Sequence, residues 1–452
     1  MAERLLSVGV DVGTTTTQLV VSAIEAENRA SGFAVPDMQI TRRQVLYRSP
    51  VRFTPLIRGE LVDGDAIARM VQQEYDAAAI RRENVDTGAI IITGETSRKE
   101  NAASVLAALS NFAGEFVVAT AGPDLESVLA AKGAGAVGWS EQTGLRVLHM
   151  DIGGGTSNLA LIEDGVITAT ACLNVGGRLI KLDGEGRVTY RSPVLEGLTD
   201  IRVGETLTRE RAMALARMLA GVLEMAAGLK EKTAAFEKLT TPGTTPLICQ
   251  PGAVISFSGG VADCIAGEKD WRSYGDIGPL LGQAIRESAL CRGKYRLGDE
   301  TIRATVIGAG CHSAQLSGST VFFEPGVLPL KNLPVSHVRE GEQTDPQAIR
   351  SALTRQETAG VLALPGWNGP SYEQVCAMAD AIAAGVGDGP CYIALREDMA
   401  KALGNALKLR LRPGMPLVCI DRVILPEGSY LDIGAPVGPA LRVVVKTLVL
   451  ET

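Results

Sequence analysis

His149-Met-Asp-Ile-Gly-Gly-Gly-Thr-Ser-Asn-Leu-Ala-Leu-Ile-Glu-Asp-Gly165 is the stretch of sequence that decides the fold. A strand predicted over 146–152 delivers Asp151 to a turn of three glycines and Thr156, and a second strand over 159–162 leads the chain back. Glycine has no Cβ, so consecutive glycines let backbone N–H groups turn toward an anion and approach it closely. Asp151 would face the same anion, which two negative groups tolerate only with a cation such as magnesium between them. The stretch predicts a phosphate-binding hairpin, although most glycine-rich turns bind nothing.

A second copy of the pattern begins the chain, as Leu6-Ser-Val-Gly-Val-Asp-Val-Gly-Thr-Thr-Thr-Thr-Gln-Leu-Val-Val21. It again contains a strand, an aspartate (Asp11), one residue, a glycine, hydroxyl residues and a strand. Two such hairpins predict two half-domains that face each other across a cleft and clamp a polyphosphate. The residues expected to cradle the phosphates are Gly13, Thr14, Thr15, Gly153, Gly154, Gly155 and Thr156.

A third element, Val254-Ile-Ser-Phe-Ser-Gly-Gly-Val-Ala-Asp263, is an apolar strand that ends in two glycines. Gly259 and Gly260 would let the backbone lie flat against a ribose and its α-phosphate. In this order the three motifs resemble those of the actin-like ATPase superfamily, over roughly residues 5–317. The resemblance implies an α/β fold of two related lobes around a nucleotide cleft.

A narrower resemblance runs nearly end to end. The stretches that carry it are Val8-Gly-Val-Asp-Val-Gly-Thr-Thr-Thr-Thr-Gln18, Gly88-Ala-Ile-Ile-Ile-Thr-Gly-Glu95, Phe116-Val-Val-Ala-Thr-Ala-Gly-Pro-Asp-Leu-Glu-Ser-Val128, Ala171-Cys-Leu-Asn-Val-Gly-Gly-Arg178 and Val443-Val-Val-Lys-Thr-Leu-Val449. In these stretches the chain is similar to the reactivating factors of ethanolamine ammonia-lyase. That likeness implies a chaperone that uses ATP to eject damaged cobalamin from an adenosylcobalamin-dependent lyase, so that intact cofactor can rebind.

The resemblance and the residue chemistry together assign catalytic roles. Asp11 and Asp151 would hold Mg²⁺, mostly through waters, beside bound ATP. Glu95 follows a strand predicted over 89–92, and we expect it either to orient the attacking water or to cap the helix that begins at Asn101. Phosphoryl transfer to water depends more on positioning and charge neutralisation than on a strong base, so one carboxylate would suffice.

Composition excludes several classes of protein. The net charge of −7 argues against a dedicated nucleic-acid binder, whose affinity would come mostly from phosphate neutralisation. The eight cysteines include no C-x-x-C pair, so zinc or iron–sulfur ligation is not expected. We find no signal peptide and no apolar run as long as a membrane span. We therefore expect a cytoplasmic protein, and the sequence leaves association with a bacterial microcompartment open.

The chain divides into three predicted domains. The first lobe covers 1–135 with a small insertion at about 25–61, the second lobe covers 136–327, and a C-terminal α/β domain covers 328–452. Five arginines without intervening acidic residues lie at 42–58, and they form either a solvated strand face or a docking surface for an acidic partner. The small residues of 130–135 predict a helix that crosses a partner helix closely, as a hinge between the lobes.

Two other functions share the same clamp. An actin-like small-molecule kinase would need a general base for an acceptor hydroxyl, and no strong candidate is found. A nucleotide-dependent scaffold would use the clamp for assembly. His149 and His312 are expected to be structural, since no Ser-His-Asp triad or histidine metal cluster accompanies them.

Overall fold

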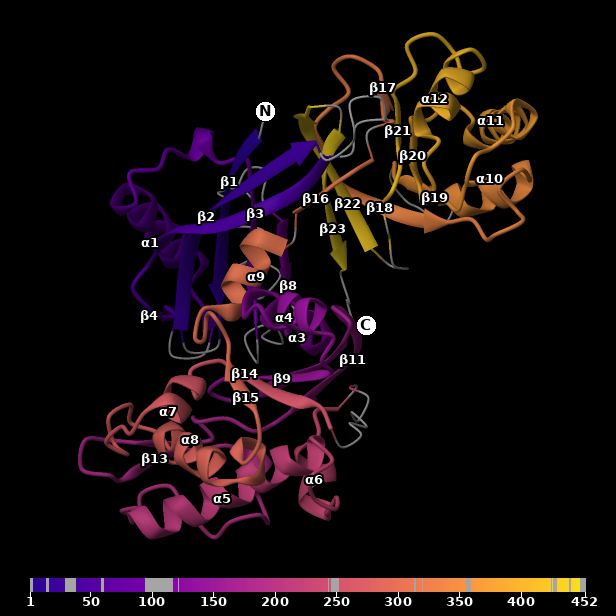
Figure 1. Cartoon of the computed structure of the whole chain (residues 1–452). Helices are drawn as coiled ribbons and strands as arrows, with labels where there is room; N and C mark the ends of the chain where they lie inside the picture. Colours follow the sequence, from indigo (N-terminus) through magenta and orange to yellow (C-terminus); the bar gives the residue numbers. More distant parts are fainter. Residues whose placement is uncertain are drawn as a thin grey trace.

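The computed structural model describes residues 3–13, 16–28, 38–57, 61–93, 117–120, 122–242, 244, 252–312, 314–318, 320–354, 359–423, 425, 429–438 and 440–447. They form two lobes, one above the other in Figure 1, and a C-terminal module beside the first lobe. Among these residues, no helix is long and apolar enough to cross a membrane.

The first lobe is built on a mixed sheet with the order β3-β2-β1-β7-β8, and the short strand β4 (Arg52–Phe53) pairs with β2. β1 is antiparallel to β2 and parallel to β7. Apolar residues of β1 and β7 pack against Ile67, Val71 and Tyr75 of α1 (Gly64–Ala77), whose first turn is capped by Asp63. The five strands are β1 (Glu3–Val12), β2 (Thr16–Asn28), β3 (Met38–Arg48), β7 (Thr87–Ile92) and β8 (Val117–Thr120).

The segment expected as an insertion, 25–61, contributes to this sheet. Residues 38–48 form its edge strand β3, which pairs antiparallel with β2. Within the described part of the segment, the element that lies outside this sheet is a two-stranded ribbon of β5 (Leu56–Ile57) and β6 (Leu61–Val62). An edge strand has one face exposed to solvent, and this accounts for the charged residues of β3.

The second lobe repeats the first in the order β11-β10-β9-β14-β15, with β9 antiparallel to β10 and parallel to β14. Its core is completed by α5 (Arg209–Ala226), capped by Thr208 as predicted, and by α8 (Gly278–Glu287). Its main strands are β9 (Val147–Ile152), β10 (Ser157–Glu163), β11 (Val166–Leu173), β14 (Val254–Ser258) and β15 (Tyr295–Leu297). The smaller elements are β12 (Ile180–Leu182), β13 (Val188–Arg191), α6 (Ala234–Leu239) and α7 (Ala262–Ala266).

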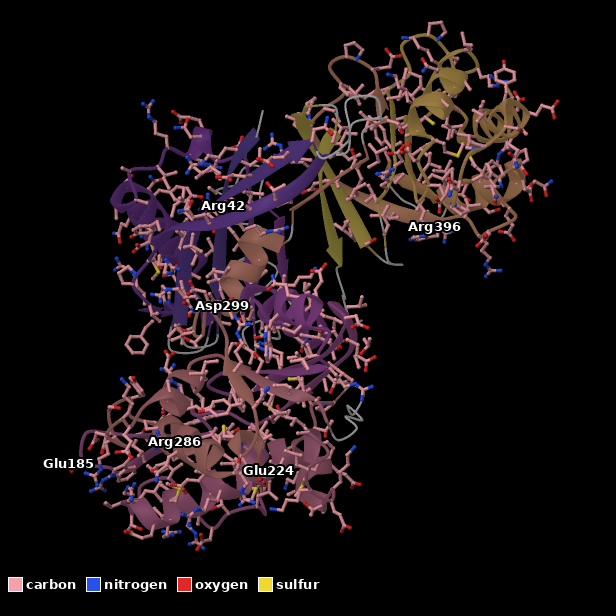
Figure 2. The ribbon with its side chains drawn as sticks, viewed as in Figure 1. Arg42, Glu185, Glu224, Arg286, Asp299 and Arg396 are labelled. Atoms are coloured by element: carbon pink, nitrogen blue, oxygen red, sulfur yellow. The ribbon has the colours of Figure 1, made fainter. Side chains whose placement is uncertain are left out.

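Two helices cross between the lobes: α3 (Pro123–Gly133), followed by α4 (Ala136–Thr143), and α9 (Ala304–His312). α3 follows the strands of the first lobe in the chain but packs on the second sheet, and α9 follows the strands of the second lobe but packs on the first. A Cβ on Gly133 would lie only 1.8 Å from the Ala304 carbonyl oxygen, so the crossing depends on small residues, as predicted. Asp299, just before α9, lies at this junction (Figure 2). Two repeated lobes with exchanged helices form the actin-like architecture expected from the sequence.

The C-terminal module contains an eight-stranded sheet in the order β16-β23-β22-β18-β19-β20-β21-β17. Strands β18 to β21 are parallel, as expected for consecutive βαβ units in an α/β domain, and three helices cover one face of the sheet. β16 and β17 precede residue 328, so the module begins earlier than expected. The elements are β16 (Ala314–Leu316), β17 (Phe322–Phe323), β18 (Leu330–His337), α10 (Pro346–Thr354), β19 (Val361–Leu364), α11 (Tyr372–Val386), β20 (Cys391–Leu395), α12 (Ala400–Lys408), β21 (Leu417–Ile420), β22 (Ser429–Val437) and β23 (Ala440–Thr447).

The module is attached to the first lobe through its β22–β23 hairpin. Ala440 is fully buried in a small cluster with Leu5, Ile24 and Ala26. The Arg442 guanidinium donates to the carbonyl oxygen of Asp86 and lies 3.6 Å from the Asp86 carboxylate. In Figure 1 the module lies beside the first lobe, at the upper right of the view.

Candidate functional site

The two predicted hairpins have the same geometry. In each, the N–H of a glycine donates to the carbonyl oxygen of the threonine three residues later, from Gly13 to Thr16 at 2.9 Å and from Gly153 to Thr156 at 2.9 Å. An aspartate lies two residues before each glycine, at the end of the incoming strand. Each lobe therefore presents one carboxylate beside one tight turn.

Asp11 is the carboxylate of the first lobe. It is 9% exposed and accepts a hydrogen bond from Thr93 Oγ1 at 2.8 Å. Burial raises the pKa of Asp11 to about 7; the Thr93 hydrogen bond opposes this shift, and the charge of Asp151 adds to it. The charge of Asp151 acts on Asp11, so the two carboxylates, one from each lobe, lie within electrostatic range of each other.

Asp151 is the carboxylate of the second lobe. It is 7% exposed, and it accepts hydrogen bonds from Ser258 Oγ and, at 3.5 Å, from Thr305 Oγ1. Burial raises the pKa of Asp151 to about 6, against the effect of both hydroxyl groups. Ser258 belongs to β14 and Thr305 to the crossing helix α9. Asp151 is therefore hydrogen-bonded to α9, one of the helices that join the lobes.

His149 supports Asp151 from behind. It is fully buried, with Nε2 2.9 Å from Ser258 Oγ and Nδ1 3.2 Å from Ser256 Oγ. The single Ser258 proton is donated to Asp151, so His149 Nε2 must carry the proton that Ser258 accepts. Burial lowers the pKa of His149 to about 3, which keeps the ring neutral. The structural role predicted for His149 is confirmed.

Two carboxamides complete the symmetry. Gln18 is the cross-strand partner of Asp11, and Asn158 that of Asp151, so each carboxamide shares a sheet face with its aspartate. Gln18 is 5% and Asn158 2% exposed, and their acceptor atoms Oε1 and Oδ1 are buried without a hydrogen-bond partner among the residues that the structure describes. Gln18 Nε2 donates to the carbonyl of Ile302, just before α9. Unpartnered buried acceptors are costly, so they point to a ligand that donates hydrogen bonds.

The three glycines of the second hairpin are held by a neighbouring turn. Gly177 N–H donates to the Gly153 carbonyl at 3.0 Å, and Arg178 N–H to that of Gly154 at 2.6 Å. A Cβ on Gly176 would lie 2.3 Å from the Gly154 oxygen, so the two turns touch through their backbones. Gly155 is exposed, and a Cβ placed on it would meet nothing within 4 Å, which leaves the outer side of the turn open.

The predicted Gly259–Gly260 turn follows β14 next to the second hairpin. Gly259 has a φ of +85°, and a Cβ there would lie 2.3 Å from the Ile152 carbonyl oxygen. Glycine is therefore required by the close approach of the backbone to the hairpin. A Cβ on Gly260 would have Ile302 as its nearest neighbour, at 3.8 Å.

Three predicted site residues lie outside the described part of the chain: Thr14, Thr15 and Glu95. Sequence reasoning overlooked five partners of the aspartates, namely Thr93, Ser258, Thr305, Gln18 and Asn158. The repeat of Asp, six residues and a carboxamide in both hairpins was a signal that could have revealed the last two.

The donor set fits Mg²⁺. Two carboxylates and two unpartnered carboxamide oxygens supply only oxygen ligands, which Mg²⁺ prefers, and a metal that keeps several waters needs few direct protein ligands. No group of three or more His, Cys, Asp or Glu side chains that could hold a metal occurs among the described residues. A cation between Asp11 and Asp151 would also offset the repulsion by Asp151 that adds to the effect of burial on the pKa of Asp11.

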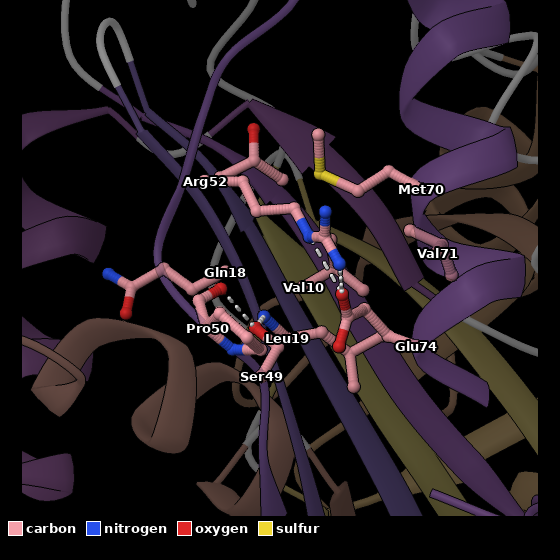
Figure 3. Close-up of a pocket in the computed structure, with 10 residues that line it drawn as sticks. Val10, Gln18, Leu19, Ser49, Pro50, Arg52, Met70, Val71 and Glu74 are labelled. Carbon is pink, nitrogen blue, oxygen red and sulfur yellow. Dashed lines mark hydrogen bonds and ion pairs between the residues drawn. The ribbon is translucent and has the colours of Figure 1, made fainter. Parts of the chain in front are cut away.

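A small pocket lies beside the first hairpin, between strands of the first lobe and α1 (Figure 3). Within it Glu74 accepts from Arg52 Nε at 2.8 Å and from the Tyr47 hydroxyl at 2.7 Å. Arg48 forms an ion pair with Glu300. The side chains of Arg48 and Arg52 are thus internally paired, which favours the structural interpretation of the arginine-rich segment.

The comparison with known proteins now identifies the relatives of this chain. A family model described as "Ethanolamine utilisation protein EutA" matches residues 3–451. The chain belongs to the EutA family. A relative from Salmonella typhimurium strain LT2, named ethanolamine ammonia-lyase reactivase EutA, is 41% identical over 465 residues and covers 98% of both chains. A relative of the same name from Escherichia coli K12 is 40% identical, again over 98% of both chains.

Solved structures of lower similarity also match the EutA-family chain. An ethanolamine utilization protein EutJ from Carboxydothermus hydrogenoformans is 20% identical, with a TM-score of 0.33, and covers 67% of this chain and 88% of its own. A PPX-GPPA enzyme of Aquifex aeolicus is 11% identical, with a TM-score of 0.42, and covers 68% of this chain and 99% of its own.

Proposed function

We propose that this chain is an ATPase that uses ATP and Mg²⁺ to reactivate ethanolamine ammonia-lyase by releasing damaged cobalamin. The observation that carries the proposal is the pair of buried carboxylates, Asp11 and Asp151, that the two lobes bring together beside matched turns. Relatives that are 40–41% identical over nearly the whole chain are named as reactivases of that lyase, which supports the choice of partner. The lyase is the partner in the cytoplasm, and cobalamin is contacted only through it.

The residue roles follow from chemistry. Asp11 and Asp151 would hold Mg²⁺ through waters that donate to Gln18 and Asn158, and the bound cation supplies charge neutralisation for the phosphates. The two hairpins would cradle the β- and γ-phosphates and Gly259–Gly260 the adenosine side. Glu95 would orient the attacking water. The full cradle is Gly13, Thr14, Thr15, Gly153, Gly154, Gly155 and Thr156.

Asp151 couples the site to the rest of the molecule. Thr305 binds Asp151 from α9, and α9 packs on the first lobe. A change in the charge at the phosphates therefore acts directly on the element that joins the lobes, and hydrolysis would change the angle between them. That motion is what a remodelling chaperone needs to open a lyase.

Recovery of lyase activity tests the proposal. Ethanolamine ammonia-lyase inactivated with cyanocobalamin is incubated with this protein, ATP, Mg²⁺ and free adenosylcobalamin. We expect recovery with wild type and its loss in Asp11→Ala and Asp151→Ala, with Asp200→Ala, a surface carboxylate paired with Arg211, as the control. ATP hydrolysis without recovery would contradict the partner assignment, and turnover stimulated by small metabolites or nucleotide-dependent sedimentation would favour a kinase or a scaffold instead.

A further inference from the structure

Arg178 lies directly on the glycine turn of the second hairpin. A Cβ placed on Gly154 would be 3.2 Å from Arg178 Cδ and 3.4 Å from its Cβ and Cγ, so the alkyl stem of the arginine runs across that glycine. The Arg178 backbone is fixed there, because its N–H donates to the Gly154 carbonyl at 2.6 Å. A positive charge is thus held beside the turn whose outer side is open.

The guanidinium is anchored at only one of its donors. Arg178 Nε contacts Asp276 Oδ2 at 3.1 Å, and Nη1 and Nη2 have no hydrogen-bond or ion-pair partner within the described part of the chain. The Arg178 side chain is 25% exposed, whereas that of Asp276 is 7% exposed. The Arg178 side chain is therefore partly exposed, its Nε is held by Asp276, and Nη1 and Nη2 remain available for bidentate binding of a phosphate.

Asp276 does not depend on Arg178 alone. Its Oδ1 accepts from the N–H of Gly278, the first residue of α8, at 2.8 Å. The charge of Lys181 also acts on this carboxylate and lowers its pKa, although burial raises the pKa overall. If the guanidinium turned away, Asp276 would still be stabilised by a backbone donor and a second cation.

We propose that Arg178 is a phosphate-binding catalytic residue, whose guanidinium contacts the β- and γ-phosphates of ATP over the Gly153–Gly155 turn. In the nucleotide-free protein Asp276 holds its Nε and keeps the side chain over Gly154. The inference rests on the proposed ATP site. Phosphoryl transfer is favoured by a positive side chain that stabilises the charge developing on the phosphate oxygens. Arg178 would supply this charge, because the two aspartates of the site contribute only negative groups.

Nucleotide affinity separates this role from a merely structural ion pair. We would measure Kd for ATP and for AMP with Mg²⁺, by calorimetry, in wild type, Arg178→Met, Arg178→Lys and Asp276→Asn. Methionine keeps an apolar stem over Gly154 and removes the charge. Arg211→Met is the matched control, because Arg211, on α5, also forms ion pairs in the second lobe, with Asp200 and Glu205 of the preceding loop.

We expect Arg178→Met to weaken ATP binding about tenfold to a hundredfold, the range of one charged hydrogen bond, and to leave AMP binding unchanged. Arg178→Lys should recover part of the loss, and Asp276→Asn and Arg211→Met should keep the wild-type preference for ATP. Equal losses for ATP and AMP, no loss at all, or the same loss in Asp276→Asn would overturn the role. If wild type itself fails to bind ATP, the proposed function and this inference are both contradicted. If wild type binds ATP and Arg178→Met binds it equally well, only this inference is contradicted.

Discussion

At the level of single residues, the site is defined by two carboxyl groups that the protein keeps partly protonated until a cation arrives. Burial raises the pKa of Asp11 to about 7 and that of Asp151 to about 6, so both groups titrate near neutral pH in the ligand-free protein. Mg²⁺ binds the ionised forms, and its affinity should rise with pH over this range.

The stability of Asp11→Asn relative to wild type should depend on pH. A carboxyl group whose pKa is raised on folding stabilises the fold below its unfolded pKa, near 4, and loses that contribution as pH rises toward 7. Between pH 5 and 8 the variant should gain about 2 to 3 kcal/mol over wild type, from about two pKa units. The lowered pKa of His149 has the opposite sign but is common to both proteins. Urea unfolding at several pH values measures the difference; a constant difference would show that Asp11 ionises normally.

Asn158→Leu should separate folding from function. Its Oδ1 is a buried acceptor without a partner, so a near-isosteric apolar side chain should leave the ligand-free stability unchanged or increase it. The gain in ATP affinity on adding Mg²⁺ should fall, because a water acceptor is lost. Calorimetry with and without EDTA measures that gain. The control is Asn405→Leu, at an exposed position on α12, and an undiminished Mg²⁺ effect in Asn158→Leu would exclude the carboxamide from the site.

Much of the site was predictable because, within each hairpin, the aspartate and the glycines lie close together in sequence. The partners of the aspartates were not predictable, because strand register and long-range packing bring these partners to the aspartates. Thr305 is 154 residues from Asp151, and Thr93 is 82 residues from Asp11. Arg178 appeared in a family motif, yet only the contact with Gly154 reveals its place on the turn.

At the level of elements, the crossing of α3 and α9 leaves no room between the two helix backbones. Gly133 faces the Ala304 carbonyl, and Gly308 faces the Leu129 carbonyl, where a Cβ would lie 2.0 Å from the oxygen. Neither oxygen can move without disturbing a helix backbone. The helices must therefore separate to admit even one methyl group.

Gly308→Ala should destabilise the fold by on the order of 2 kcal/mol or more, since overpacking outweighs the gain in helix propensity. Gly138→Ala is the matched control. Gly138 lies inside α4, where an added Cβ would meet nothing within 4 Å, so that change should stabilise by about 0.5 to 1 kcal/mol. Thermal unfolding compares them, and similar melting temperatures would contradict the close crossing.

The central strands were predicted well because their apolar pattern is a local signal, as with 146–152 and 89–92, which correspond to β9 and β7. Strand β18 was missed because Pro334 and polar residues interrupt its pattern. β3 lies in the segment that was assigned to an insertion, and the solvated strand face considered for its arginines agrees with its place at the edge of the sheet.

At the level of the whole molecule, the C-terminal module and the first lobe form one arm, and the second lobe forms the other (Figure 1). The module is fixed by Arg442, whose side chain is only 13% exposed, and by the buried Ala440. α9 and β16 are consecutive in the chain, so the hinge helix leads directly into the sheet of the module.

Arg442→Ala should loosen the module without affecting the nucleotide site. The loss of the contacts with Asp86 should increase the radius of gyration in small-angle scattering and leave the affinity for ATP unchanged. Arg396→Ala, on the outer surface of the module (Figure 2), should change neither quantity. A radius equal to that of wild type would mean that the Ala440 cluster alone holds the module.

The direct passage from α9 into β16 makes the C-terminal sheet a lever. β16 is one edge of the sheet and β17 the other, seven strand spacings away, or about 34 Å at about 4.8 Å each. A rotation of about 10° at the helix crossing would then move the far edge by about 6 Å relative to the second lobe. Because the helix crossing admits no extra methyl group, the two helices have little freedom to move independently, and most of such a rotation would be transmitted to the sheet. A small angular change at the phosphates would then become a displacement as large as a side chain at the far edge.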